Sequence, residues 1–342
     1  MQARIASILS ALDRIPSSRV TVFGDFCLDK YLLIDPDRDE PSVETGLTAY
    51  QVVGTRKYPG GAGAVVNNLR ALGAQVRCVG LLGDDGEGYE LLQALRATGA
   101  DTEYMVQSTE LCTSTYTKPM RRQPDGSYQE MNRLDMRNFS RLSPAVEDRL
   151  IQSLNNALRD TQGIVIIEQF LERNFAAVTD RVRDTLGALA RKHPEKFFYA
   201  DSRGFAKEYR DIIVKCNNLE LITAMEPLAN AEDFQTILRN GEALCKANGK
   251  AAVVTLGEEG ACVFENAGVT KLTAFQVEGP LDIVGAGDAT SAGTILGLTL
   301  GLDLPSAALL GGCVSSITIQ QIGVTGTATV AQVRERLMAA LG

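Results

Sequence analysis

The sequence predicts an α/β domain with a mainly parallel sheet that helices cover on both faces. Short β-branched runs alternate with helical patterns along most of the 342 residues, and 45% of the residues are hydrophobic, enough for a sizeable core. Ligands of such folds bind at the carboxyl ends of the strands. The expected strands are 20–24, 76–82, 163–167, 197–200, 219–223 and 251–256. The expected helices are 62–72, 86–97, 145–158, 175–191, 232–247 and a late apolar helix over 289–300.

Two segments, 30–58 and 113–134, break this alternation. They hold short extended runs and carry turn signals such as Asp35-Pro36 and Pro124-Asp-Gly126. We expect them to form a small β lid that projects from the edge of the sheet. Because the chain shows no internal repeat and no long linker, residues 1–342 are expected to form a single domain that carries this lid.

Charge and composition argue against several classes of function. The net charge is −8 and no strong basic run is present, which disfavours nucleic acid or an anionic membrane as the main partner. The chain has one histidine, His193, in a polar stretch where a solvated position is expected. A Ser-His-Asp triad and a histidine-based metal site are therefore disfavoured.

The cysteines and the N-terminus predict a cytoplasmic protein. The seven cysteines are odd in number and include no Cys-x-x-Cys pair, a pattern that fits reduced, buried thiols. Residues 1–12 follow a helical pattern and lack the apolar core of a signal peptide. The run 283–300 is apolar enough for a membrane span, but its Gly-Ala-Gly-Asp element and the lack of flanking basic residues favour a buried helix.

The stretch Asp282-Ile-Val-Gly-Ala-Gly-Asp-Ala-Thr290 is the most informative motif. Its small residues Gly285, Ala286 and Gly287 let a ligand approach the backbone, and amides at a helix start attract anions. Asp288 follows at once, where it could take a proton from a hydroxyl that attacks a phosphate. An Asp that only caps the helix is an equally good interpretation of these nine residues alone. The dinucleotide fingerprint fits poorly because Thr290 stands where a glycine is needed, and no Gly-Lys-Ser/Thr of a P-loop follows.

Three further motifs are candidate binding elements. Asp25 and Asp29 follow the first strand, and carboxylates suit sugar hydroxyls. The alternative is a turn residue and a surface residue; it is credible for Asp29, whereas the place of Asp25 directly after an apolar strand favours function. Gly60-Gly61 precedes a helix that carries Asn68, which suits either a close ligand or a plain turn. The turn Thr255-Leu-Gly257-Glu-Glu-Gly260 could carry a nucleotide, but on sequence alone a simple hairpin is favoured.

Together and in this order, these motifs resemble the ribokinase-like (PfkB) carbohydrate kinase family, from about Arg19 to the C-terminal helix. The most specific parts are Gly60-Gly61, with its helix that ends in Ala71-Leu-Gly-Ala74, and 282–288. Within the family the chain is most similar to the heptose-7-phosphate kinases. The segments that carry this finer resemblance are Gly24-Asp-Phe-Cys-Leu-Asp-Lys-Tyr31, Pro59-Gly-Gly-Ala62, Thr115-Tyr-Thr-Lys118 and Asn132-Arg-Leu-Asp135.

The resemblance implies a Rossmann-like, three-layer αβα core, a β lid over the sugar, ATP with Mg²⁺, and a homodimer formed through the lid. It leaves open whether a monovalent cation is needed. It implies Asp288 as the catalytic base and a sugar or sugar phosphate as substrate. It also implies an anion hole at Gly285, Ala286 and Gly287, sugar contacts from Asp25, Asp29, Gly60, Gly61 and Asn68, and nucleotide contacts from Thr255, Gly257, Gly260, Gly312 and Cys313.

Several positions depart from the family pattern. Ala64 stands where an Asn is expected, although Asn68 matches a later Asn, and Val284 replaces a Thr near the phosphates. The family has an Asn-x-x-Glu element associated with Mg²⁺ and phosphate. Aligning it on the expected strand 219–223 gives Met225 and Leu228, and a shift gives the weaker metal candidates Asn230 and Asp233.

The loop after the central strand departs as well, and it bears on the substrate. The Asp-Tyr-Gly-Lys-Gly of heptose kinases becomes Gln169-Phe-Leu-Glu-Arg173. Basic side chains that could hold a substrate phosphate are Lys118, Arg121, Arg122, Arg203 and Lys207, although for each one taken singly a solvated surface position is favoured. A second hypothesis is therefore a non-catalytic sugar or nucleotide sensor of the same descent. A nicotinamide-dependent oxidoreductase is disfavoured because its glycine pattern is absent.

Overall fold

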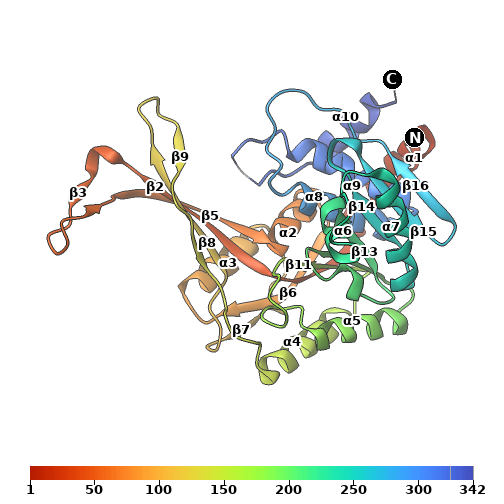
Figure 1. Ribbon diagram of the computed structural model, residues 1–342, viewed down its shortest axis with the longest axis horizontal. Coiled ribbons are helices and arrows are strands. Elements are labelled where there is room, and N and C mark those ends of the chain that lie inside the picture. The colour runs from red at the N-terminus through yellow and green to blue at the C-terminus, as the bar shows by residue number, and fades with distance from the viewer. Residues whose placement is uncertain (324, 342) are drawn as a thin grey trace.

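A nine-stranded sheet forms the centre of the molecule in the computed structural model, which describes residues 1–323 and 325–341 (Figure 1). The strand order is β16-β15-β14-β13-β12-β11-β1-β6-β7, parallel from β14 to β7 and antiparallel at β15 and β16. The strands are β1 (Arg19–Gly24), β6 (Gln75–Gly83), β7 (Val106–Ser108), β11 (Gly163–Glu168), β12 (Phe197–Ser202), β13 (Ile213–Asn217), β14 (Ala252–Thr255), β15 (Ala261–Glu265) and β16 (Gly268–Leu272).

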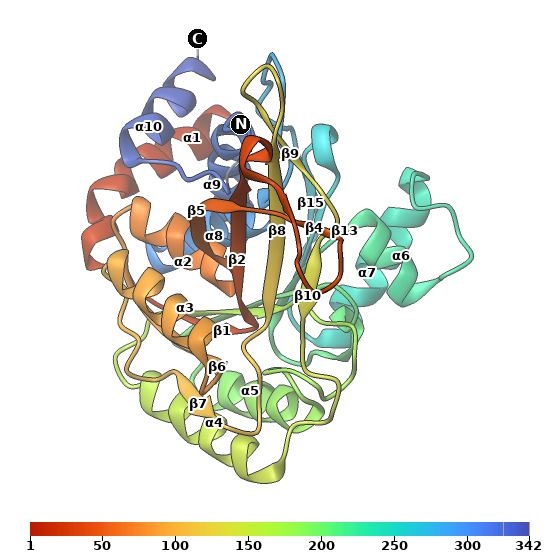
Figure 2. The same ribbon diagram turned by 90° about the vertical axis from the view of Figure 1, so that its left-hand side faces the viewer.

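Helices cover both faces of this sheet and make three layers (Figures 1 and 2). The core on one face includes residues of α1 (Gln2–Ala11), α2 (Ala62–Ala71), α3 (Gly86–Ala97), α8 (Ala286–Thr299), α9 (Leu304–Thr318) and α10 (Val330–Ala339). The core on the other face includes residues of α4 (Pro144–Ala157), α5 (Asp180–Lys192), α6 (Asn218–Met225) and α7 (Phe234–Asn248). The predicted fold class, a three-layer α/β core with a mainly parallel sheet and a β lid, is confirmed.

Alternation along the central strands explains why both faces are apolar. Val22 of β1 is buried in the first core and Phe23 in the second, because successive side chains of a strand point to opposite faces. In β11, Val165 is likewise buried in the first core and Ile166 in the second. Such doubly buried strands have continuous apolar sequences, which is the pattern that predicted them.

The lid is a second sheet with the order β10-β8-β2-β5, to which β9 adds on β8. Its strands are β2 (Phe26–Ile34), β5 (Val52–Gly61), β8 (Thr115–Arg122), β9 (Tyr128–Glu130) and β10 (Leu134–Met136), and a short hairpin of β3 (Glu40–Pro41) and β4 (Thr48–Ala49) extends it. Figure 1 shows the lid projecting far from the three-layer core. The lid strands begin directly after Asp25 and return at Gly61, so the lid is joined to the core beside β1 and α2.

The expected strand over 219–223 is wrong. That segment belongs to α6, and the strand lies earlier, at Ile213–Asn217. The physical reason is a capping box: the side chain of Asn217 accepts from the amide of Glu220, and the side chain of Glu220 accepts from the amide of Asn217, both at 2.8 Å. This pair starts a helix despite the β-branched residues inside it.

Smaller differences concern helix ends. The helix expected from residue 175 begins at Asp180, where Thr179 caps it, and the helix expected from residue 289 begins at Ala286. Helix α9, Leu304–Thr318, was not among the predicted elements. Among the described residues, no helix has both the length and the apolar character that a membrane crossing requires.

Candidate active site

The first turn of α8 lies at the carboxyl end of the parallel strands. Gly285 caps the helix with a left-handed φ of 81°, which favours glycine. The amides of Gly287 and Asp288 have no carbonyl four residues earlier within the helix, so they are free to donate to an anion. Asp282 holds the preceding loop, because its carboxylate accepts from the amides of Val284 and Gly323 at 3.1 and 3.0 Å. An anion site at this turn stays a prediction, with which the free amides are consistent.

The carboxyl of Asp288 has a raised pKa. The residue is half-buried, and burial raises the pKa of its carboxyl to about 7. Asp201 raises this pKa further, whereas the positive charges of Lys215 and Arg203 lower it. The side-chain amide of Gln169 donates to Asp288, with 3.4 Å between Nε2 and Oδ1. A carboxyl with a pKa near neutrality can accept a proton at physiological pH.

A buried ion pair lies next to this turn. Lys215 of β13 donates to Asp201 of β12 over 2.9 Å, and Ser291 of α8 donates to the same carboxylate oxygen over 2.7 Å. Strands β12 and β13 are neighbours in register at these residues. The pair therefore joins two central strands to the helix that carries Asp288.

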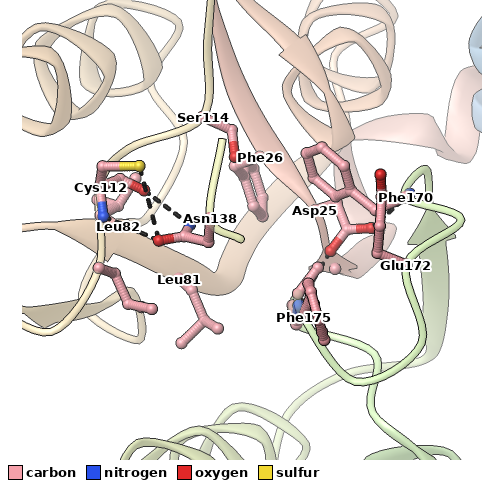
Figure 3. A pocket seen from close by; sticks show the side chains of 14 residues that line it. Asp25, Phe26, Leu81, Leu82, Cys112, Ser114, Asn138, Phe170, Glu172 and Phe175 are labelled. Carbon is pink, nitrogen blue, oxygen red and sulfur yellow. Dashed lines mark hydrogen bonds between the residues drawn. The ribbon is translucent and has the colours of Figure 1, made fainter. Parts of the chain in front are cut away.

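Asp25 holds the loop 169–177 instead of facing open solvent (Figure 3). It is 4% exposed; its Oδ2 accepts from the amides of Gln169 and Phe170 at 2.8 and 3.4 Å, and its Oδ1 accepts from the amide of Ala177 at 3.1 Å. Burial raises the pKa of Asp25 to about 7. A small cavity of about 30 Å³ lies beside it, with Phe26, Phe170 and Phe175 among its lining residues. A sugar hydroxyl can replace these amides at Asp25 only if the loop moves.

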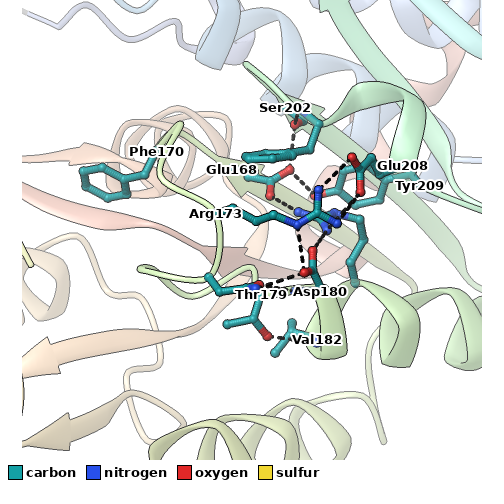
Figure 4. A network of polar contacts seen from close by, with 12 residues as sticks. Glu168, Phe170, Arg173, Thr179, Asp180, Val182, Ser202, Glu208 and Tyr209 are labelled. Carbon is teal, nitrogen blue, oxygen red and sulfur yellow. Dashed lines mark hydrogen bonds and ion pairs between the residues drawn. The ribbon is translucent and has the colours of Figure 1, made fainter. Parts of the chain in front are cut away.

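A polar network anchors the base of this loop (Figure 4). Glu168, the last residue of β11, accepts from Arg183 at 2.5 Å, from Ser202 at 2.6 Å and from Tyr209 at 2.9 Å. Further along the loop, Arg173 pairs with Asp180 and Glu208. Because Glu168 is buried with three donors, the residue before Gln169 is fixed to the core, while the loop beyond it is free to differ from the family pattern.

The glycine pair brings Asp29 against the backbone. A Cβ on Gly60 would lie 2.5 Å from the Oδ2 of Asp29 and 2.9 Å from the Sγ of Cys27, so only glycine allows this approach. Gly61 has a φ of 57°, and a Cβ there would lie 2.5 Å from the carbonyl oxygen of Asp25. Asp29 pairs with Lys118 at 3.3 Å. The charge of Asp29 also raises the pKa of Asp288.

Asn68 is not brought to the open part of the site. Its side chain is fully buried, and its amide donates to the carbonyls of Ala64 at 3.0 Å and Gly326 at 3.5 Å. These contacts fasten α2 to the segment before α10. The compensation that Asn68 was expected to make for Ala64 has no support in these contacts.

The expected nucleotide positions divide into open and packed ones. Thr255 ends β14 directly opposite Asn217 of β13. No atom lies within 4 Å of the Cβ position of Gly257 or of Gly312, so a ligand could approach either backbone. Gly260 instead packs against the carbonyl of Leu272 in a turn with a φ of 97°. The Cys313 side chain is buried, with its Sγ 3.8 Å from the carbonyl of Val333.

The structure reveals an acidic element that the alignment on 219–223 missed. With β13 ending at Asn217, the Asn-x-x-Glu pattern is met by Asn217-Asn-Leu-Glu220, at the carboxyl end of a central strand. Burial raises the pKa of Glu220, and the charge of Lys215 lowers it. The capping box itself was the available signal, because Asn followed three residues later by Glu marks a helix start.

The weaker metal candidates have local roles. Asp233 caps α7 through the amides of Gln235 and Thr236, and Asn230 accepts from the amide of Glu232 at 3.0 Å. Within residues 1–323 and 325–341, no group of three or more His, Cys, Asp or Glu is placed to hold a metal ion. Mg²⁺ commonly binds one or two carboxylates together with substrate phosphates, so the residues present fit a metal that enters with ATP.

The basic lid residues are used in ion pairs. Arg121 pairs with Asp39 at 2.7 Å, and Arg122 pairs with Asp35 at 2.5 Å and Asp37 at 2.6 Å. Lys118 contacts both Asp29 and the hydroxyl of Tyr31. Arg203 and Lys207 are exposed, and the charge of Arg203 lowers the pKa of Asp288. Of the five basic candidates, only Arg203 is among the main charges that act on the pKa of Asp288.

Comparisons with known proteins agree with this geometry. A family model described as pfkB family carbohydrate kinase matches residues 19–330. The bifunctional protein HldE of Geobacter sulfurreducens is 29% identical over 317 residues, which are 91% of this chain and 61% of that protein. The bifunctional protein HldE of Helicobacter pylori is 25% identical over 311 residues, which are 89% of this chain and 64% of that protein. The chain thus spans less than two thirds of the length of these relatives.

Solved structures show the same fold at lower identity. Ribokinase from Arabidopsis thaliana, complexed with ribose and ATP, aligns with a TM-score of 0.66 at 17% identity and covers 95% of this chain and 98% of that one. A variant of phosphofructokinase-2 from Escherichia coli aligns with a TM-score of 0.70 at 15% identity and covers 94% and 99%. At these identities the likeness establishes the fold alone.

Proposed function

The chain belongs to the pfkB family of carbohydrate kinases, and we propose that it transfers the γ-phosphate of ATP to a hydroxyl of a sugar phosphate, with a heptose 7-phosphate as the first candidate. The observation that carries this proposal is the position of Asp288. It lies in the first turn of α8, directly after the free amide of Gly287, and its pKa is about 7. A base and an anion site in one helical turn are the arrangement that phosphoryl transfer requires.

In the proposed reaction Asp288 takes the proton of the attacking hydroxyl. The hydroxyl oxygen forms a bond to the γ-phosphorus as the bond to the β,γ-bridging oxygen breaks, and ADP leaves. The amides of Gly287 and Asp288 donate to the transferred group. Mg²⁺, held through Asn217, Glu220 and the phosphates of ATP, would neutralise charge on those phosphates.

The lid supplies the sugar side of the proposed site. Asp29 lies against Gly60, and its charge raises the pKa of Asp288. Its carboxylate is therefore suited to accept hydrogen bonds from sugar hydroxyls near Asp288. The exposed cation Arg203 is placed to attract a substrate phosphate. The thiols of all seven cysteines are free, which supports a reducing, cytoplasmic location. We propose that the chain works as one kinase domain with its lid.

A homodimer through the lid is part of the proposal. Several apolar side chains of the lid are exposed, a pattern that marks interaction surfaces. They are Val43, Leu47, Val52, Val53 and Leu134, with exposed fractions of 103%, 72%, 45%, 53% and 63%.

A matched panel of substrates tests the proposal. ATP consumption is measured with Mg²⁺ and K⁺ for each sugar in its free form and in its terminally phosphorylated form. We expect turnover with at least one phosphorylated sugar and weaker turnover with its free counterpart. Faster turnover with the free sugar would contradict the sugar-phosphate assignment while leaving the kinase activity intact.

A second candidate function, a sugar or nucleotide sensor, is favoured by one observation. Asp25 and Asp288 are both in contact with the loop 169–177, so the two carboxylates are shielded in this state. Calorimetric binding of ATP or of a sugar phosphate without turnover of any member of the panel would favour the sensor.

A further inference from the structure

Lys215 is a buried cation with one charged partner. Its side chain is 6% exposed, and its Nζ lies 2.9 Å from the Oδ2 of Asp201. Burying an ammonium is costly unless it is paired, and such pairs give little net stability.

The ammonium lies at the N-terminal end of α8. A Cβ built on Gly287 would lie 2.9 Å from the Nζ of Lys215, so a side chain at residue 287 would have to displace the ammonium. Because the Cα–Cβ bond of a helical residue is tilted toward the N-terminus, this space is on the same side as the free amides. The ammonium of Lys215 and the amides of Gly287 and Asp288 therefore lie on the same side of the helix start.

Electrostatics make this position unfavourable unless an anion is shared. A helix N-terminus carries partial positive charge, so a lysine beside it is repelled by the helix dipole. Asp201 offsets part of this repulsion, and one hydrogen of the ammonium is used on it. The remaining two N–H groups are available for an acceptor.

The position of Val284 gives this cation a chemical role. The family pattern has a Thr there, whose hydroxyl lies near the phosphates, whereas Val284 has no donor and is 64% exposed. One donor is thus missing from the anion site on the loop side. Lys215 supplies a charged donor from the strand side.

We propose that Lys215 is a catalytic residue: its ammonium donates to the phosphoryl group as that group passes the first turn of α8, and Asp201 holds it in place. Lys215 keeps its proton throughout; the proton from the sugar goes to Asp288, and the electron pair of the broken P–O bond leaves with ADP. This inference rests on the proposed kinase function.

The test must separate catalysis from the ion pair. Lys215→Met alone would leave Asp201 buried and unpaired, so the decisive variant is Lys215→Met with Asp201→Asn, which neutralises both partners. Asp201→Asn alone, which keeps the ammonium but removes its charged partner, is measured beside it. For each protein we would measure thermal melting, kcat, KM for the sugar phosphate, and calorimetric affinity for ADP and for the non-hydrolysable ATP analogue AMP-PNP.

We expect the double variant to fold and to bind ADP within about threefold of wild type, while kcat falls by roughly 10²–10³-fold, the usual effect of losing one donor to a developing oxyanion. We expect the sugar KM to change little, and we expect kcat of Asp201→Asn to fall less than that of the double variant, because Asp201→Asn keeps the ammonium. A folded double variant with kcat within about threefold of wild type would overturn the proposal. If the double variant does not fold, Lys215→Gln takes its place, because its side-chain amide can still donate to Asp201. We expect the same fall in kcat and the same ADP binding from it.

Failure of the kinase proposal itself gives a different result. Wild-type protein would then consume no ATP with any sugar, and Lys215 would be tested by binding alone. An AMP-PNP affinity in the double variant that is weaker by about tenfold or more, with ADP unaffected, supports a contact with the γ-phosphate. Unchanged AMP-PNP affinity overturns it.

Discussion

The side-chain amide of Gln169 donates to the carboxylate of Asp288, with 3.4 Å between Nε2 and Oδ1. The backbone amide of the same residue donates to Asp25 at 2.8 Å. Gln169 therefore links the residue at the end of β1 to the residue that we assign as the base. The contact uses Oδ1 of Asp288, so a hydroxyl that Asp288 deprotonates can approach Oδ2.

The pH dependence of turnover follows from this environment. Asp288 must be ionised to accept a proton, and its pKa is about 7, so kcat/KM should rise with pH and reach half its limit near pH 7. Gln169→Glu puts a second carboxylate beside Asp288, which raises the pKa of Asp288 and moves this limb upward by about one pH unit. Rate profiles between pH 5 and 9 measure both. An unchanged limb in the variant would show that residue 169 does not contact the base.

Two raised carboxyl pKa values predict that stability declines with pH. Asp25 and Asp288 both have a pKa of about 7 in the folded protein and 3.8 as the reference value. Between about pH 4 and 7 the folded state therefore binds more protons than the unfolded state, and the stabilisation is lost as pH rises through 7. Melting temperatures should be lower at pH 8 than at pH 5.5, and Asp288→Asn should reduce this difference. Equal slopes for wild type and variant would contradict the assignment of Asp288.

Glu220 should be needed for the metal, and Asp233 should not. Glu220→Gln removes one negative charge beside Lys215 but keeps an oxygen for the capping box, so the half-saturating Mg²⁺ concentration should rise by roughly tenfold, or about 1.4 kcal/mol. Asp233→Ala removes only the cap of α7, at a cost of about 1 kcal/mol of stability, and should leave the Mg²⁺ requirement unchanged. Magnesium titrations of ATP turnover decide between them. A Mg²⁺ effect in the Asp233 variant alone would return the metal site to the loop before α7.

Gly60 should be intolerant of any side chain. In Gly60→Ala the new methyl group meets Asp29 and Cys27 at 2.5 and 2.9 Å, so Asp29 must shift, the sugar KM should rise, and stability should fall by about 1–3 kcal/mol. Gly86→Ala is the matched control, because no atom lies within 4 Å of its Cβ position, and there alanine should be neutral or slightly stabilising. Chemical denaturation and sugar titrations measure both variants. A Gly60 variant with normal stability and normal KM would remove Asp29 from the sugar site.

The elements that the sequence predicted well are those whose local signals agree with their tertiary role. The strand at 20–24 is apolar on both faces, and Asp85 and Ser143 cap helices that also carry an apolar stripe. Segment 219–223 shows the opposite case, because its β-branched residues indicated a strand while Asn217 and Glu220 formed a capping box that started a helix.

The site was predicted only where one segment contains all the chemistry. The stretch 282–288 places an anion site and an acid in one helical turn, so a short motif is sufficient. The partnership of Lys215 with Gly287, and of Asp25 with the loop 169–177, joins segments far apart in the chain. Such contacts depend on the order of the strands in the sheet and on the course of the loops. A short sequence pattern predicts neither. Because the strand was expected at 219–223, the Asn-x-x-Glu pattern was aligned past Asn217 and Glu220.

The central claim is that Asp288 is the base of a sugar kinase. The most direct measurement is single-turnover phosphoryl transfer by Asp288→Asn with the best substrate of the panel, alongside calorimetric ATP binding. We predict an intact fold, ATP affinity close to wild type and a rate lower by roughly 10²–10⁴-fold, the usual contribution of a general base. A variant that transfers phosphate at a near-normal rate would contradict the assignment.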